Sequence, residues 1–458
     1  MGVNGRFDLV VLGGGPGGTR AVLDAAGFGM SCALVEAAFL GGTCLNVGCI
    51  PTKFLLGGSA SIASAAAQRR YKVARSLPDL DFTALQTRKA RFVKGLRLSV
   101  EKQMQEAGVK IFRGRGSFCG EDRLRVEGGD APVELSFSSC IVAAGSIAAF
   151  FPGLRADGAS VLSSAGLLAA KKVPDSLIIV GGGAIGLELG EIFHRFGCRV
   201  SIVEAQARLL PGEDEEIGEC FRAHFAREGW SIHTGRSVAS LLTVDGRSRL
   251  RFADGEEIEA EKSLIATGRR PRVKHLAPEA AGLELTDRGW IKTDENLMAA
   301  RRIYAVGDVN GRVQLAHAAD HQARFAAAHA AGRERGPYTP PAMPSCVYGS
   351  MEAMRVGPTA LELKREGREI FLSRAPLAGN AIAQSTGSAQ GMVRMLWEGD
   401  ELRGVSAAGH GVSHLVTAAA LLLAGGVKKN MPLPVIFAHP TLDESLETAI
   451  VAPTESIV

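Results

Sequence analysis

Two stretches of the chain show the same order of apolar run, glycine cluster and helical pattern. Phe7–Leu12 is apolar and rich in Val and Leu, and the sequence GGGPGG and a helical pattern over residues 19–26 follow it. Ser176–Val180 is also apolar, and it leads into GGGAIG and a helical pattern that runs through Phe196. Short apolar runs bounded by glycine predict buried strands. Each stretch therefore predicts a strand, a tight turn and a helix.

The first glycine cluster has the spacing of a dinucleotide-binding loop. Gly13 permits the tight turn, Gly15 lets a pyrophosphate approach the backbone, and Gly18 lets helix and strand pack closely. The next predicted strand, Cys32–Val35, ends in Glu36, whose carboxylate can accept hydrogen bonds from ribose hydroxyls. A surface acid after a glycine loop is the alternative interpretation. We favour a nucleotide site, because strand, glycines, helix and acid occur in the expected order.

The second cluster repeats the first and predicts a second nucleotide site. Val200–Val203 is the strand after its helix, and Glu204 follows 18 residues beyond the last motif glycine. A carboxylate there accepts a bond from a ribose 2′-hydroxyl and repels a 2′-phosphate, which favours NAD over NADP. Only Arg208 supplies a basic group nearby. The predicted contacts from this cluster and its acid are Gly181, Gly183, Ile185, Gly186 and Glu204.

The remaining pattern predicts further helices and strands. Residues 57–110 look helical, and the basic residues between Arg88 and Lys102 are interpreted as a solvated face, with docking of an acidic partner domain as the alternative. Leu415–Ala424 predicts a buried helix that is too short to span a bilayer. Glu369–Leu372 and Met392–Leu396 predict strands in the last segment.

Composition narrows the class of protein. The chain has 458 residues, 46% of them hydrophobic, and a formal net charge of +4 from 52 basic and 48 acidic residues. That balance predicts no general attraction to nucleic acid or membrane. Eight cysteines spread over this length do not form a secreted disulfide framework, so we expect a cytoplasmic protein.

Cys44 and Cys49 are the candidates for chemistry, because they lie just beyond the first glycine loop. A regular helix would hold positions five apart at Cα separations of about 8 to 9 Å, too far for a disulfide. The pair can therefore bridge only if residues 45–48 leave helical geometry, which Gly48 makes easier. Two buried thiols, or half of a metal site, are the alternatives. No second cysteine or histidine cluster has ligand spacing, so we predict no metal.

The sequence GGTCLNVGCIPTK at residues 41–53 is highly specific, and the chain resembles the FAD-dependent pyridine nucleotide–disulfide oxidoreductases. Within that family it is most similar to the dihydrolipoamide dehydrogenases. Other matching motifs follow in the family's order: ATG at 266–268, IYAVGD at 303–308 and FAHPTLDE at 437–444. The resemblance implies an α/β fold with two Rossmann-like domains, for FAD and NAD, and a C-terminal α+β dimerisation domain. It implies that residues 1–147 and 269–340 form the FAD domain, 148–268 the NAD domain and 341–458 the interface domain.

The resemblance also implies roles for individual residues. Cys44 and Cys49 would form the redox-active disulfide, and Lys53 would lie by the flavin, paired with Glu188. His439, oriented by Glu444, would reach into the active site of the other subunit, so that a homodimer shares its sites. The remaining FAD contacts would be Thr43, Gly116, Ser146, Asp308 and Ala316, and the remaining NAD contacts Val238 and Gly268.

The implied activity is oxidation of dihydrolipoyl groups on a carrier protein, with NAD⁺ as acceptor. The alternatives are a glutathione-reductase-like NAD(P)H-dependent disulfide reductase and an enzyme that serves a non-standard lipoyl carrier. Mercuric reductase would need a cysteine pair near the C-terminus, but the last cysteine is Cys346. A non-enzymatic binding module would not need the complete set of catalytic residues. The chain departs from the family pattern at Ala144, Gly349–Met351 and Ala408–His414.

Overall fold

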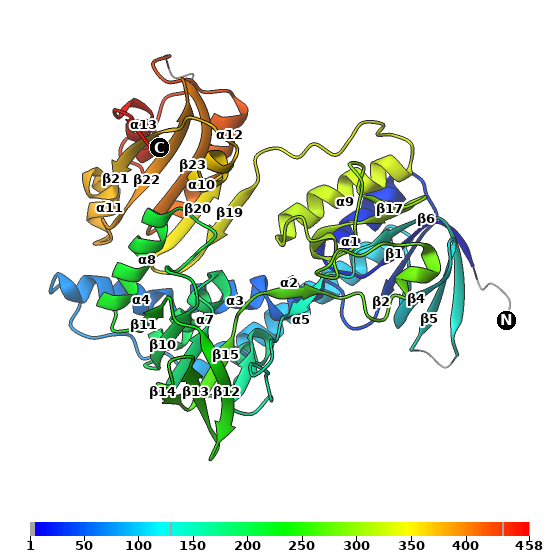
Figure 1. The fold of residues 1–458 in the computed structure, drawn as a ribbon, viewed down its shortest axis with the longest axis horizontal. Coiled ribbons are helices and arrows are strands. Elements are labelled where there is room, and N and C mark those ends of the chain that lie inside the picture. The colour runs from blue at the N-terminus through cyan, green and yellow to red at the C-terminus, as the bar shows by residue number, and fades with distance from the viewer. Residues whose placement is uncertain (1–4, 129–130, 433–434, 458) are drawn as a thin grey trace. The chain divides into compact units, whose positions relative to one another are not determined.

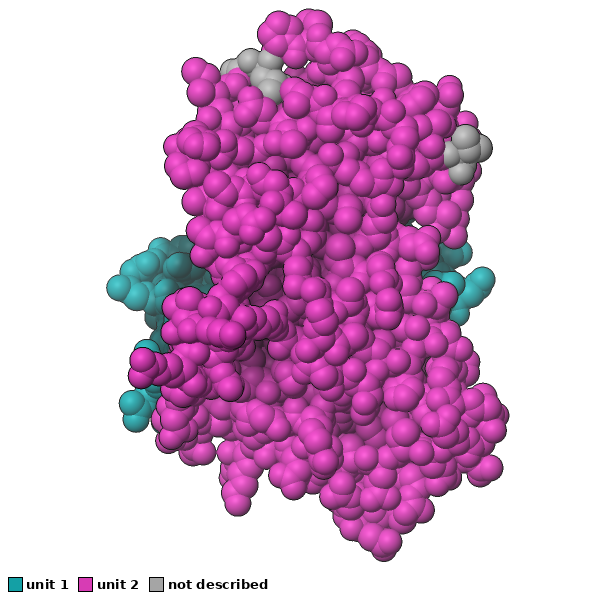
Figure 2. All heavy atoms as spheres, turned by 90° about the vertical axis from the view of Figure 1, so that its left-hand side faces the viewer, with its two compact units in different colours: residues 1–51, 87–149, 268–340 teal, residues 52–86, 150–267, 341–458 magenta. Residues whose placement is uncertain are grey.

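The computed structural model describes residues 5–128, 131–432 and 435–457. The chain falls into two compact units. Unit 1 comprises residues 1–51, 87–149 and 268–340, and unit 2 comprises residues 52–86, 150–267 and 341–458, coloured separately in Figure 2. The predicted division between a nucleotide domain at 148–268 and an interface domain at 341–458 stays a prediction, because unit 2 contains both.

Unit 1 is built on a mostly parallel sheet with the strand order β17-β18-β6-β1-β2-β3. The central strand β1 (Arg6–Leu12) pairs in parallel with β2 (Cys32–Glu36) and β6 (Val133–Val142). Helices α1 (Pro16–Gly27) and α9 (Ala316–Ala330) lie side by side on this sheet (Figure 1). Buried alanines on both helices share one apolar core with β1, and their small side chains let the helices approach closely.

Shorter elements complete unit 1. Strands β4 and β5 extend the main sheet from β6, and β7 pairs with β16. Their bounds, with the short helices, are α2 (Gly42–Val47), β3 (Lys110–Arg113), β4 (Arg115–Gly120), β5 (Arg123–Glu127), β7 (Ser146–Ala148), β16 (Arg269–Pro271), η1 (Pro278–Ala281), β17 (Met298–Ala300), β18 (Ile303–Ala305) and η2 (Gly307–Asn310).

The first part of unit 2 repeats the nucleotide-binding architecture. A parallel sheet has the order β11-β10-β9-β15-β8, and β9 (Ser176–Val180) coincides with the predicted strand. Helix α7 (Ala184–Arg195) connects β9 to β10 (Arg199–Glu204). The other elements are α6 (Ser164–Leu168), α8 (Glu215–Arg227), β8 (Val161–Ser163), β11 (Ser231–Thr234), β15 (Lys262–Ile265) and the antiparallel β12 (Val238–Val244), β13 (Arg247–Phe252) and β14 (Glu257–Ala260).

The last part of unit 2 is an antiparallel sheet of six strands in the order β19-β20-β23-β22-β21-β24. Helices α12 and α13 share an apolar core with it. The bounds are β19 (Pro344–Val347), β20 (Glu352–Val356), α10 (Ala360–Arg365), β21 (Phe371–Pro376), η3 (Leu377–Gly379), α11 (Ala381–Ser385), β22 (Gly391–Glu398), β23 (Glu401–Gly409), η4 (Val412–Leu415), α12 (Val416–Ala424), α13 (Glu444–Val451) and β24 (Glu455–Ser456). The predicted α/β class with a C-terminal α+β portion is confirmed.

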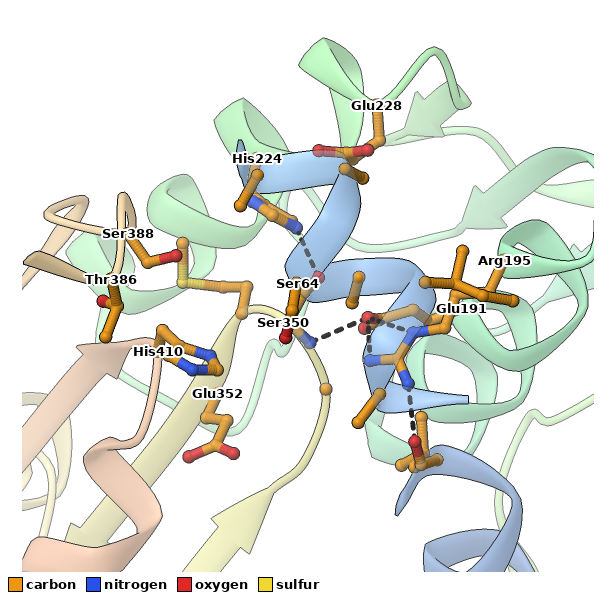
Figure 3. A pocket seen from close by; sticks show the side chains of 18 of the residues that line it. Ser64, Glu191, Arg195, His224, Glu228, Ser350, Glu352, Thr386, Ser388 and His410 are labelled. Carbon is orange, nitrogen blue, oxygen red and sulfur yellow. Dashed lines mark hydrogen bonds and ion pairs between the residues drawn. The ribbon is translucent and has the colours of Figure 1, made fainter. Parts of the chain in front are cut away.

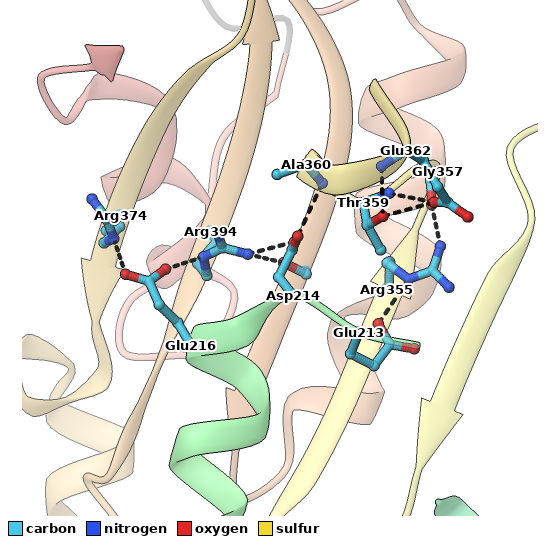
Figure 4. A network of polar contacts seen from close by, with 11 residues as sticks. Glu213, Asp214, Glu216, Arg355, Gly357, Thr359, Ala360, Glu362, Arg374 and Arg394 are labelled. Atoms are coloured by element: carbon cyan, nitrogen blue, oxygen red, sulfur yellow. Dashed lines mark hydrogen bonds and ion pairs between the residues drawn. The ribbon is translucent and has the colours of Figure 1, made fainter. Parts of the chain in front are cut away.

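Buried ion pairs join these two parts of unit 2 (Figure 4). Asp214 precedes α8 and lies 2.5 Å from Arg394 of β22, and both side chains are at least 95% buried. Glu216 also pairs with Arg394, and it accepts a bond from Arg374 at 2.8 Å. Each of these carboxylates contacts a guanidinium, so no charged group among them is buried without a partner of opposite charge.

The helical prediction for residues 57–110 is confirmed for most of that range. The residues belong to three helices, α3 (Cys49–Gly58), α4 (Ala60–Arg70) and α5 (Phe82–Glu106). Asp81 starts α5 by accepting the Thr83 and Ala84 amides, a local cap that periodicity does not reveal.

The prediction of a buried helix at Leu415–Ala424 is wrong, because α12 is not buried within its own chain. Of its nine residues only Ala419 and Leu422 are buried, whereas Leu421 is 68% exposed. An apolar composition all round the helix therefore did not predict burial, because the chain covers only one side. Among the described residues, no helix combines the length and hydropathy needed to cross a membrane.

Candidate active site

The two candidate cysteines belong to different helices. Cys44 is half-buried in α2, Cys49 is exposed at the start of α3, and Gly48 between them has φ −143° and ψ −116°. A Cβ at Gly48 would lie 2.9 Å from the Thr43 carbonyl oxygen, so glycine is required there. The expected departure from helical geometry over residues 45–48 occurs at Gly48 alone, because one glycine is enough to interrupt the helix.

Two glycines of the first loop, Gly13 and Gly18, leave no room for a side chain. Gly13 has φ +103°, and a Cβ there would lie 2.4 Å from the Ala143 carbonyl oxygen. A Cβ at Gly18 would lie 1.8 Å from the Gly13 carbonyl oxygen. Helix α1 begins at Pro16, and Gly15 before it supplies no capping side chain. Its N-terminus suits a phosphate group, so these residues fit a bound dinucleotide.

Glu36 lies at the end of β2, beside the loop. Its Oε2 accepts the Gly14 amide at 2.7 Å, and its Oε1 accepts the Ala38 amide at 2.7 Å. The carboxylate therefore holds the backbone of the glycine loop. Its predicted bond to a ribose stays a prediction.

The second loop has the same construction. Gly181 has φ +116°, and a Cβ there would lie 2.4 Å from the Ala266 carbonyl oxygen. A Cβ at Gly186 would lie 2.3 Å from the Gly181 carbonyl oxygen. Glu204 Oε2 accepts the Gly182 amide at 2.7 Å. These residues also fit a dinucleotide.

Asp308 belongs to a polar group in unit 1. Ser146 donates its hydroxyl to Asp308, and Arg269 lies 2.6 Å from the Ser146 hydroxyl oxygen and 3.6 Å from Asp308. Sequence reasoning missed Arg269, although it directly follows the ATG motif at 266–268. The other predicted cofactor residues are Thr43 in α2, Gly116 in β4, Ala316 at the start of α9, Gly183 and Ile185 at the start of α7, Val238 at the start of β12 and Gly268 before β16.

Lys53 and Glu188 form an ion pair within unit 2. Lys53 Nζ lies 2.6 Å from Glu188 Oε2, and Glu188 is 5% exposed. Burial raises the pKa of the Glu188 carboxyl, and Lys53 opposes that shift. Glu188 Oε1 also accepts the Tyr348 amide at 3.1 Å, and Lys53 Nζ lies 4.7 Å from the centre of the Tyr348 ring. Sequence reasoning missed Tyr348, because no motif marks it.

His439 and Glu444 form a second pair in unit 2. His439 Nδ1 lies 2.7 Å from Glu444 Oε1, and the His439 side chain is 77% exposed. Glu444 Oε2 accepts the Thr441 amide at 2.8 Å. The bond to His439 lowers the pKa of Glu444. The carboxylate thus binds one nitrogen of an exposed imidazole ring and fixes the orientation of that ring.

Metal-ligand chemistry has no candidate here. Within residues 5–128, 131–432 and 435–457, no three His, Cys, Asp or Glu side chains come together as metal ligands would.

Comparison with protein families gives two matches. Residues 7–323 match the pyridine nucleotide–disulphide oxidoreductase model, and residues 343–450 match the dimerisation domain of the same family.

Several known proteins are similar over nearly the whole chain. Dihydrolipoyl dehydrogenases of Chlorobaculum parvum and Bacillus subtilis are each 34% identical, over 98% and 99% of this chain and the same shares of their own. The HOCl-induced flavoprotein disulfide reductase RclA of Escherichia coli is 26% identical, with a TM-score of 0.85 over 97% of this chain and 99% of its own. LpdA of Mycobacterium tuberculosis, at 23% identity and a TM-score of 0.88 over 97% of this chain and 98% of its own, shows the same fold.

Proposed function

The chain belongs to the pyridine nucleotide–disulphide oxidoreductase family, whose enzymes use FAD and NAD to act on sulfur groups, and from that premise we propose that it is a dihydrolipoyl dehydrogenase. In this proposal it oxidises dihydrolipoyl groups on a carrier protein and reduces NAD⁺. The single observation that supports thiol oxidation most directly is the His439–Glu444 pair, with 2.7 Å between ring nitrogen and carboxylate.

The proposed chemistry uses the chain's own groups in order. His439 of the partner subunit takes a proton from the substrate dithiol, and Glu444 stabilises the charged ring. The substrate thiolate attacks Cys44 and releases Cys49 as a thiolate, and the second substrate sulfur then displaces Cys44 from the mixed disulfide. The products are a substrate disulfide and a reduced cysteine pair. Bound FAD supplies the two-electron transfer from that pair to NAD⁺.

Glu204 supports NAD⁺ as the acceptor. Its Oε2 already holds the Gly182 amide, which places the carboxylate at the edge of the second loop. A negative group at this position repels a 2′-phosphate. With dihydrolipoamide as substrate, purified and FAD-loaded enzyme should therefore have a higher kcat/KM for NAD⁺ than for NADP⁺. An equal or better value with NADP⁺ would refute this assignment.

A second candidate function is reduction of a disulfide substrate at the expense of NADH. It is favoured by the 26% identity with a flavoprotein disulfide reductase. Steady-state rates should be measured in both directions, with dihydrolipoamide and NAD⁺ and with NADH and small disulfides. We expect dihydrolipoamide oxidation by NAD⁺ to be the faster reaction. An enzyme that reduces disulfides with NADH but does not oxidise dihydrolipoamide would be a disulfide reductase.

Shared active sites can be tested by complementation. Cys44→Ser and His439→Gln homodimers should each be nearly inactive. The first lacks the sulfur that the substrate thiolate attacks, and loss of a positioned base in the second should lower the rate by about 10² to 10⁴-fold. A mixed dimer contains one site with both changes and one with neither. Random exchange should restore about one quarter of wild-type activity. No recovery in a mixed dimer verified by mass spectrometry would contradict sharing.

A further inference from the structure

Helix α7 holds one loop with two buried carboxylates. Glu188 and Glu191 lie three residues apart on α7 and are 5% and 3% exposed. Glu188 accepts the Tyr348 amide at 3.1 Å, and Glu191 accepts the Ser350 amide at 2.7 Å. The loop after β19 is thus fixed at two successive points by charge-assisted hydrogen bonds.

Arg195 extends this contact to the helix that carries Lys53. Its guanidinium donates to Glu191 Oε1 at 2.6 and 3.1 Å, and both side chains are more than 90% buried. Its Nη1 donates to the Leu56 carbonyl oxygen at 2.7 Å and to the Ser59 hydroxyl at 3.0 Å. Arg195 therefore links α7 to the backbone within one turn of Lys53.

The loop fits the Glu191 carboxylate only because residue 349 is glycine. Gly349 has φ +159°, and a Cβ there would lie 2.2 Å from Glu191 Oε2. That oxygen is buried and has no hydrogen-bond partner among the described residues. Close packing against Gly349, rather than a further hydrogen bond, holds this side of the carboxylate.

A cavity lies next to the same loop, so packing alone does not hold the loop in place. The cavity has a volume of about 710 Å³, and its walls include Lys53, Glu191, Arg195 and Ser350. Figure 3 shows the last three of these side chains. On this side, His224 Nε2 lies 2.9 Å from the Ser350 hydroxyl oxygen. If the bonds from Glu191 were lost, the loop could move into open space.

We propose that Glu191 and Arg195 are positioning residues that hold Lys53 and the Tyr348 ring in their places around Glu188. The inference rests on the proposed function and on the role that the family resemblance implies for Lys53, whose ammonium would lie by the flavin and favour its reduced, anionic form. Neither residue touches substrate or cofactor in this role. Each acts through a neighbour: Arg195 through the backbone of α3, and Glu191 through the loop that carries Tyr348.

The test compares flavin potentials of full-length, FAD-loaded dimers. Glu191→Gln and Arg195→Met should make the flavin reduction potential more negative, because the ammonium is less well placed. Dihydrolipoamide turnover should fall by up to about 100-fold, the effect of a misplacement near 1 Å. Gly349→Ala should act in the same direction, because its Cβ displaces the carboxylate without removing a charge.

A matched control separates positioning from stability. Glu213→Gln breaks another ion pair of unit 2, Glu213 to Arg355 at 2.7 Å, with side chains 15% and 20% exposed. It should lower the Tm but leave the potential and kcat unchanged. A potential shift in this control as large as in Glu191→Gln would overturn the proposal, and so would a Glu191→Gln enzyme with a lower Tm and an unchanged potential.

A double variant tests whether the effect passes through Lys53. In a Lys53→Met background, Glu191→Gln should shift the potential no further, since the two changes affect one interaction. An equal additional shift would overturn the proposal. The potential can be measured with a chemical reductant, so a wild-type enzyme that fails to oxidise dihydrolipoamide would refute the proposed function without deciding the positioning role.

Discussion

The two nucleotide loops have the same backbone and different surroundings. Gly13 and Gly181 have φ values of +103° and +116°, and the acid at the end of each second strand holds a loop amide at 2.7 Å. Two residues after the last motif glycine the helices diverge. Arg20 of α1 is partly exposed and pairs with Asp320 at 2.9 Å, whereas Glu188 of α7 is buried against Lys53.

This difference shows how one local motif serves two tasks. The glycines and the terminal acid set the backbone of each loop in the same way, through one close carbonyl contact and one bond from a loop amide. The side chains that the helix buries beyond its first turn depend on the elements that pack against it. Helix α1 packs alanines against α9, whereas α7 buries Glu188 and Glu191, which hold the loop after β19.

The largest expected effect comes from the same substitution in the two loops. Gly13→Ala and Gly181→Ala each place a Cβ 2.4 Å from a carbonyl oxygen. We expect a loss of about 4 kcal/mol in local stability, at the upper end for point substitutions. Gly13→Ala should be purified without FAD, and Gly181→Ala should retain FAD but bind NAD⁺ poorly. Flavin absorbance and the KM for NAD⁺ measure this, and the reverse pattern would exchange the two sites.

Removing the cation at each divergent position should destabilise the chain by different amounts. Lys53→Met leaves the buried Glu188 without its cation. This should cost about 3 kcal/mol, the lower end for a broken buried pair, because the Lys53 side chain is 35% exposed. Arg20→Met removes a partly exposed pair worth about 0.2 to 1 kcal/mol. Urea unfolding of both variants measures the difference. Glu188→Gln is the control, and it should cost less than Lys53→Met because Lys53 keeps access to water. Equal costs for Lys53→Met and Arg20→Met would contradict the contrast between the helices.

Each terminal acid should affect the binding of one cofactor only, Glu36 that of FAD and Glu204 that of NAD⁺. Glu204→Ala should weaken NAD⁺ binding by roughly 1 to 3 kcal/mol, the range for a lost charged hydrogen-bond partner. Glu36→Ala should weaken FAD by a similar amount and leave the KM for NAD⁺ unchanged in the FAD-loaded enzyme. Titration calorimetry for each cofactor tests this, and a Glu204→Ala enzyme with wild-type NAD⁺ affinity would remove Glu204 from the site.

The smallest expected effect is a pH dependence that the Glu188 pair of α7 shows and the Arg20 pair of α1 does not. Burial raises the folded-state pKa of Glu188, so the folded chain binds a proton more readily than the unfolded one. Stability from this group should therefore rise as pH falls from the folded pKa towards about 4.3, by at most about 1.4 kcal/mol per pH unit. The cost of Lys53→Met should shrink in the same range. The cost of Arg20→Met should stay constant from pH 5 to 8, and denaturant titrations at several pH values compare them.

Short-range pattern accounts for the parts that sequence reasoning predicted well. Ser176–Val180 is a strand with those bounds, and both glycine loops and their terminal acids lie where the spacing placed them. Positive φ at the first glycine and the close approach of the last glycine to it are local requirements, so residue type and spacing predict them. The contacts of Gly13 with Ala143 and of Gly181 with Ala266 join distant segments, and spacing does not reveal them.

Sequence alone therefore determined the two strand–loop–helix units, the cysteine segment and the family. Tertiary structure decided which distant side chains meet: Tyr348 on Glu188, Arg195 on Leu56 and Ser59, and Arg394 on Asp214. These contacts join residues more than 130 positions apart, and no local periodicity encodes them. It also decided that α12 keeps an exposed apolar side, because burial depends on what packs against a helix and not on its composition.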